Sequence, residues 1–107
     1  YSEAINNIIY TRKWRDFCFN YFEKFPNPKT SNIKDYYNNF KVEIKELEKY
    51  LEKNGEKISS YSPKEISDLK WSLMVELSSY YYSDQSRYIL NTFRDSDVKK
   101  AIEEMSN

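Results

Sequence analysis

The stretch YSPKEI, residues 61–66, marks the start of a helix more clearly than any other part of the chain. Ser62 suits the N-cap position, because its hydroxyl can accept a hydrogen bond from the amide of Glu65 while the Glu65 carboxylate reaches back to the Ser62 amide. Pro63 follows at the first helical position, where its missing N–H costs nothing. A helix therefore begins after Ser62.

This helix is predicted to run to about Arg94, with a break at Ser83-Asp84 as an alternative. The helical period places its apolar residues on two stripes about 150° apart. One stripe consists of Ile66, Leu69, Leu73, Leu77, Tyr80 and Tyr88, and the other of Trp71, Val75, Tyr82, Ile89 and Phe93. A helix that is apolar on two sides is typical of the centre of a bundle. The alternative is that the stripe with Trp71 is partly exposed and contacts a partner.

A second long helix is predicted between Ser31 and Asn54. One face of it collects apolar residues within about 80° on the helical wheel, namely Ile33, Tyr37, Phe40, Ile44, Leu47 and Leu51. Asn54-Gly55 supplies its stop, because glycine can adopt the left-handed conformation. Its other faces alternate lysine and glutamate, which indicates a solvated surface.

The first helix is predicted to begin after a Ser2 cap and to end at about Phe25, where two prolines follow in FPNPKTS. Its apolar face changes side along its length. Three isoleucines point one way, and Tyr10, Trp14, Phe17, Cys18, Tyr21 and Phe25 point roughly the opposite way. Either the helix breaks or bends near Thr11 around its own core, or the isoleucines pack against another protein chain.

Ser96 is expected to cap a short last helix containing Val98, Ala101, Ile102 and Met105. The predicted fold is therefore all-α, a small antiparallel helical bundle of three long helices plus a short C-terminal helix. Residues 1–107 are expected to form a single domain. Because the chain opens on Tyr1, an excised or processed part of a longer protein is one interpretation.

Composition excludes several classes of protein. The 17 basic and 17 acidic residues cancel, so no long-range field attracts polyanions. One cysteine, Cys18, excludes an intrachain disulfide and favours an intracellular, cytoplasmic location. No apolar run approaches the roughly 20 residues that cross a bilayer, and no signal peptide is visible. The abundance of Lys, Asn, Ile, Tyr and Phe is typical of AT-rich genomes, such as those of some bacteria, parasites and viruses.

The residues needed for most catalytic chemistry are missing from the sequence. There is no histidine, and the only glycine cannot build a phosphate-binding loop. Cys18 lies between Phe17 and Phe19 and is expected to pack in the core. Acidic pairs such as Glu48 and Glu52 are best explained as solvated surface. We therefore expect a protein that is not an enzyme and that carries no cofactor and no metal.

The leading hypothesis is a module that binds another protein, or a second copy of itself, through apolar surface on the first and third predicted helices. The expected partner-binding residues are Ile5, Ile8, Ile9, Arg12 and Trp71. The alternative is nucleic-acid binding through Arg12, Lys13 and Arg15. Residues 1–30 carry five basic and three acidic side chains, a surplus too small for a typical nucleic-acid binder.

Overall fold

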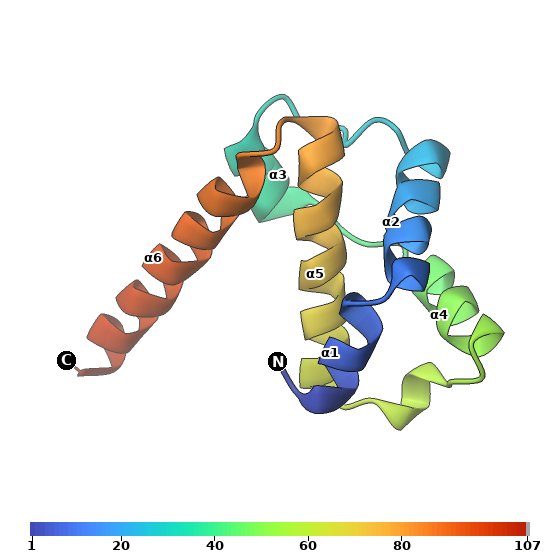
Figure 1. Ribbon diagram of the computed structural model, residues 1–107. Helices are drawn as coiled ribbons and strands as arrows, with labels where there is room; N and C mark the ends of the chain where they lie inside the picture. Colours follow the sequence, from blue (N-terminus) through green and yellow to red (C-terminus); the bar gives the residue numbers. More distant parts are fainter. Residues whose placement is uncertain (107) are drawn as a thin grey trace.

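The computed structural model describes residues 1–106, which form helices connected by short loops, without a β-strand (Figure 1). This confirms the all-α class. The helices are α1 (Glu3–Ile9), α2 (Arg12–Lys24), α3 (Ile33–Asn39), α4 (Ile44–Lys53), the 3₁₀ turn η1 (Ile58–Ser60), α5 (Pro63–Tyr81) and α6 (Ser86–Ser106).

Helix α5 runs through the centre of the molecule and contacts α1, α2 and α6. In Figure 1, α1 and α2 lie on one side of α5 with α4 beyond α2, while α3 and the start of α6 lie on the other side. From there α6 runs obliquely away from the body, so its C-terminal end stands apart from α5.

The side chains divide into two cores that share α5. The main core joins α1, α2, α4 and α5 through Ile5, Trp14, Cys18, Tyr21, Leu47, Leu51, Leu69, Leu73 and Leu77. The second core joins α3, α5 and α6 around Tyr36, Met74 and Leu90, with Trp71 and Phe93 packed against it. Both predicted stripes thus take part in packing over α5, which is the central helix of the fold. Tyr88 and Ile89, which lie past the break, are exposed.

Two predicted helix ends are confirmed in detail. At the start of α5, the Ser62 hydroxyl accepts from the Glu65 amide (3.1 Å), and the Ser62 amide donates to the Glu65 carboxylate (3.0 Å). At the end of α4, Gly55 has a φ of 79°, and the next amide, that of Glu56, donates to the Leu51 carbonyl (2.8 Å). This pattern is a Schellman motif, in which a left-handed residue closes the helix.

The predicted bundle of three long helices is wrong, because each long helix is interrupted. The first breaks at Tyr10, beside the position near Thr11 given as an alternative. The Thr11 hydroxyl caps α2 by accepting from the Trp14 amide (3.2 Å) and donates to the Ile8 carbonyl (2.7 Å). The second breaks at residues 40–43, where the Glu43 amide donates to the Tyr21 hydroxyl (2.9 Å).

The third predicted helix breaks at residues 82–85, at the site given as an alternative. The separate short helix expected after Ser96 is also wrong, because α6 continues through this residue. A serine caps a helix only where the backbone leaves helical geometry, and no glycine or proline interrupts α6 to cause this. The Tyr37 hydroxyl, which donates to the Asp97 carboxylate (2.7 Å), fastens this part of α6 to α3.

Candidate functional site: a groove between α2 and α4

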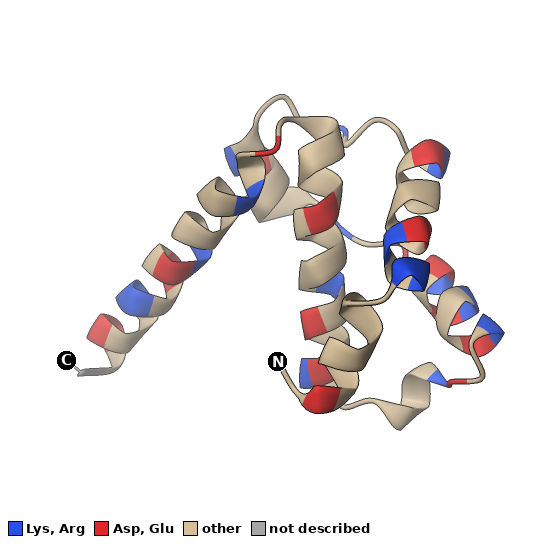
Figure 2. Cartoon of the chain, viewed as in Figure 1, with Lys and Arg blue, Asp and Glu red and all other residues tan. Residues whose placement is uncertain are grey.

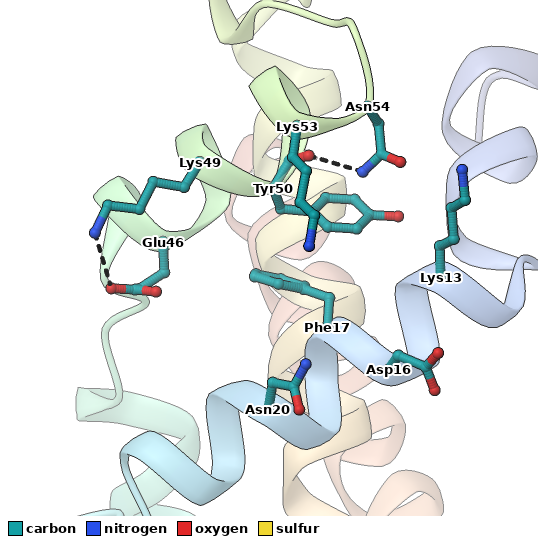
Figure 3. Close-up of a pocket in the computed structure, with 9 residues that line it drawn as sticks. All are labelled: Lys13, Asp16, Phe17, Asn20, Glu46, Lys49, Tyr50, Lys53 and Asn54. Atoms are coloured by element: carbon teal, nitrogen blue, oxygen red, sulfur yellow. Dashed lines mark hydrogen bonds and ion pairs between the residues drawn. The ribbon is translucent and has the colours of Figure 1, made fainter.

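An open groove of about 500 Å³ lies between α2 and α4. Each helix contributes four residues at positions i, i+3, i+4 and i+7, the spacing of one helical face. Helix α2 supplies Lys13, Asp16, Phe17 and Asn20, α4 supplies Glu46, Lys49, Tyr50 and Lys53, and Asn54 closes the end of α4. Figure 3 shows Phe17 of α2 and Tyr50 of α4 facing one another, with the other lining side chains arranged around them.

Two aromatic rings form the floor of the groove. The centroids of Phe17 and Tyr50 are 4.7 Å apart with an angle of 31° between the ring planes. Trp14, which is buried beneath them, packs edge-on against Tyr50 with centroids 5.6 Å apart. Phe17 and Tyr50 are themselves half-buried, and burial raises the pKa of the Tyr50 phenol, so this hydroxyl is neutral at physiological pH. The floor is therefore rigid, largely apolar and open on one side.

The rim of the groove carries three lysines, Lys13, Lys49 and Lys53, and two carboxylates, Asp16 and Glu46. Glu46 is already engaged by Lys24 and by Lys49 (3.8 Å), and the hydrogen bond from Lys24 lowers its pKa. Lys13 and Lys53 are exposed, and no described carboxylate lies within ion-pairing distance of either ammonium group. Basic and acidic residues are otherwise interspersed on α2, α4 and α6 (Figure 2). Among the described residues, the groove thus offers two unpaired positive charges, Lys13 and Lys53, and one unpaired carboxylate, Asp16, above an apolar floor.

A second hollow of about 430 Å³ adjoins the groove and shares Lys13, Tyr50 and Asn54 with it. Its other lining residues come from α1 and its junction with α2, from Leu51 of α4 and from the segment before α5, and they include Ile8, Thr11 and Tyr61. The two hollows form one surface that follows α4 past the junction between α1 and α2. This junction is the place where the sequence shows its change of apolar face.

The expected partner-binding residues occupy different environments. Ile5 is fully buried in the main core, and Ile8 and Ile9 pack against that core while half-buried. Arg12 is exposed. The isoleucines thus pack against apolar residues of their own chain. This agrees with the alternative in which the first helix bends around its own core. A role in partner binding stays a prediction for these residues.

Trp71, the fifth expected partner residue, is half-buried against the second core rather than the main core. Tyr37 packs edge-on against it with centroids 6.2 Å apart, and the Arg94 guanidinium lies 4.7 Å from the centre of its ring. The isoleucines and Trp71 therefore belong to separate cores. Of the five expected residues, only Ile8 lines the groove or its adjoining hollow.

The basic cluster proposed for nucleic acid lies on the first turn of α2. Arg12, Lys13 and Arg15 are all exposed. Arg12 and Arg15 are three residues apart and lie on one side of α2, whereas Lys13 points about 100° away from Arg12. Only Lys13 lines the groove.

Residues of the groove were missed from sequence because the lysine and glutamate run of α4 was interpreted as a solvated face. The available signal was the matching i, i+3, i+4, i+7 pattern of polar and aromatic residues on α2 and α4. The sequence pattern does not show that these two helix faces lie next to each other in the fold.

Groups for metal binding or thiol chemistry do not converge in the described chain. Over residues 1–106, no three metal-ligating side chains gather at one point. Cys18 is fully buried, and burial raises the pKa of its thiol. None of the described helices has both the length and the apolar character required to cross a bilayer.

Comparisons of this chain with known protein families, with curated proteins and with solved structures found no match.

Proposed function

We propose that this chain is a non-enzymatic interaction module that binds an acidic segment of another protein in the groove between α2 and α4. The observation that carries the proposal is the placement of two unpaired lysines, Lys13 and Lys53, around the rigid aromatic floor of Phe17 and Tyr50. An intracellular setting, where a lone thiol stays reduced, suits this role.

The aromatic floor favours an apolar side chain as the anchor of the bound segment. Phe17 and Tyr50 are held by Trp14 from below, so an apolar ligand would gain contact without ordering the rings first. Anchors of this kind contribute most of the binding energy at protein interfaces, and rigid aromatic residues are common there.

The rim favours a segment that also carries carboxylates. A partner with acidic residues on both sides of its apolar anchor would place them near Lys13 and Lys53. Exposed pairs of this kind each contribute only about 0.2–1 kcal/mol, so they select the partner and speed its approach more than they hold it.

The test measures binding of labelled peptides that place one leucine or phenylalanine among glutamates. We expect saturable binding that weakens about tenfold in Lys13→Glu/Lys53→Glu, because two attractive contacts become repulsive. The matched control is Lys57→Glu/Lys70→Glu, which reverses the same charge at two exposed lysines outside both hollows. Equal losses in the two double variants, or no binding by the unaltered chain, would reject the proposal.

A second candidate function is nucleic-acid binding. It is supported by the exposure of Arg12, Lys13 and Arg15 together with the absence of a described carboxylate paired with any of them. Gel shifts at low salt decide it: a true binder loses affinity steeply as salt rises and when Arg12 and Arg15 become alanine. Binding that ignores those two substitutions would end this alternative.

A further inference from the structure

Helix α6 is attached to the body by its first half. Leu90 is fully buried in the second core and Phe93 packs against that core. Arg94 covers the ring of Trp71, and Asp97 accepts the hydrogen bond from Tyr37. The C-terminal end of α6 stands apart from α5 in Figure 1. Val98, Ile102 and Met105 in this half of the helix are each more than half exposed.

The turn that reverses the chain between α5 and α6 is short and contains neither glycine nor proline. Local bonds hold it: the Ser83 amide donates to the Ser86 hydroxyl (3.2 Å), the Ser86 amide donates to the Ser83 carbonyl (3.1 Å), and the two hydroxyls lie 3.4 Å apart. The Tyr82 hydroxyl also lies 2.6 Å from the Thr30 hydroxyl. Because the turn contains no glycine or proline, each of its residues can also adopt helical geometry at a modest cost in helix propensity.

The apolar period of α5 continues into α6 as if no turn intervened. On one unbroken helix, the exposed residues Val98, Ile102 and Met105 fall within about 80° of a single face. That face is the same one that carries Ile66, Leu69, Leu73, Leu77 and Tyr80 of α5. The apolar period is thus the one that a straight helix through the turn would have, although the structure shows a hairpin.

From these observations we propose that two copies of the chain exchange α6. In each copy the turn at residues 82–85 straightens, α5 and α6 become one helix, and Leu90 and Phe93 fill the second core of the other copy. The contacts of α6 with α3 and α5 re-form between copies, so the exchange keeps them. The contacts of the turn itself, including the Tyr82 ring with Tyr36 and the Tyr82 hydroxyl with Thr30, are given up and oppose the exchange. The entropy of association opposes it, so the dimer grows with protein concentration.

The first test changes the turn in opposite directions and measures molar mass by light scattering from micromolar to millimolar protein. Ser83→Ala/Asp84→Ala favours the straight helix in both copies and is expected to strengthen dimerisation about 50-fold. Asp84→Pro is expected to stay monomeric, because proline suits the second position of the turn Ser83–Ser86 and prevents a continuous helix. Monomers in both variants at every concentration, or a dimer that Asp84→Pro leaves unchanged, would overturn the proposal.

The second test separates exchange from association of two closed monomers. Cysteines replace Tyr37 and Asp97, whose side chains touch between α3 and α6, in a Cys18→Ala background that also carries the alanine turn. In the dimer fraction, a short bismaleimide is expected to join the two chains covalently on a denaturing gel. Cross-linking within single chains of that dimer would show that α6 has stayed in place and would overturn the exchange.

Discussion

Tyr36→Phe tests the hydrogen bond that fastens α3 to the central helix. The side chain is fully buried, and its hydroxyl donates to the Met74 carbonyl at 2.6 Å. The substitution keeps the ring and its contacts with Phe40 (4.7 Å between centroids) and Tyr82 (5.5 Å). Because Met74 lies inside α5, its carbonyl retains the helical amide four residues on. We therefore expect the loss of one net hydrogen bond, about 1 kcal/mol of unfolding free energy.

Urea unfolding followed by circular dichroism measures this loss. For a domain of this size a slope of about 1–2 kcal/mol per molar urea converts it to a midpoint lower by about 0.5–1 M. Tyr88→Phe is the control, because Tyr88 is 71% exposed and loses only a solvated hydroxyl. An unchanged midpoint in Tyr36→Phe, or an equal decrease in the control, would show that the buried bond does not hold α3 in place.

Three further predictions follow from local features. Gly55→Ala should lower the free energy of unfolding by about 1 kcal/mol, because alanine is strained at the φ of 79° that Gly55 adopts. Nothing lies within 4 Å of an added Cβ, so no clash adds to this loss. An unchanged urea midpoint would contradict the role of this left-handed residue in ending α4. Cys18 should react with Ellman's reagent only on unfolding, and rapid labelling of the native chain would refute its burial. Burial raises the pKa of Tyr81 to about 12 from an ordinary value near 10, so its contribution to stability is intact below pH about 10 and is lost as pH rises towards about 12. Denaturant midpoints measured between pH about 10 and about 12 test this prediction for Tyr81. It would be contradicted by a constant midpoint in the unaltered chain, or by an equal decrease in Tyr81→Phe.

Helix ends governed by neighbouring residues could be predicted from sequence. The start at Ser62 depends on a hydroxyl and a carboxylate three residues apart, and the stop at Gly55 depends on one backbone conformation. Both features are complete within six residues, so no knowledge of the fold was required.

The break at residues 40–43 could not be predicted in the same way, because its causes are distant in sequence. The Glu43 amide, which an unbroken helix would satisfy internally, bonds to Tyr21 on α2. Phe40 packs against both cores, with its ring 4.7 Å from Tyr36 and 6.1 Å from Tyr81. Helical period alone does not contain these tertiary contacts, and tertiary contacts override weak local preference.

The candidate site also combines features that the local sequence predicts with features that depend on tertiary contacts. Lys13 was recognised as an exposed cation, and Ile8 as part of an unusual junction, from the sequence. The groove itself depends on α4 lying beside α2, which places Tyr50 against Phe17 and Lys53 near them. Each helix on its own is an ordinary amphipathic segment, so the hollow exists only once the two faces meet.

Nuclear magnetic resonance mapping of an acidic peptide on the isotope-labelled chain tests the central claim most directly. The peptide carries one leucine or phenylalanine among glutamates. The account predicts saturable amide shifts confined to residues 13–20 of α2, to residues 46–54 and to the adjoining α1–α2 junction. Saturable shifts centred on α6 and the second core, or no shifts at millimolar peptide, would contradict the assignment of the groove between α2 and α4 as the binding surface.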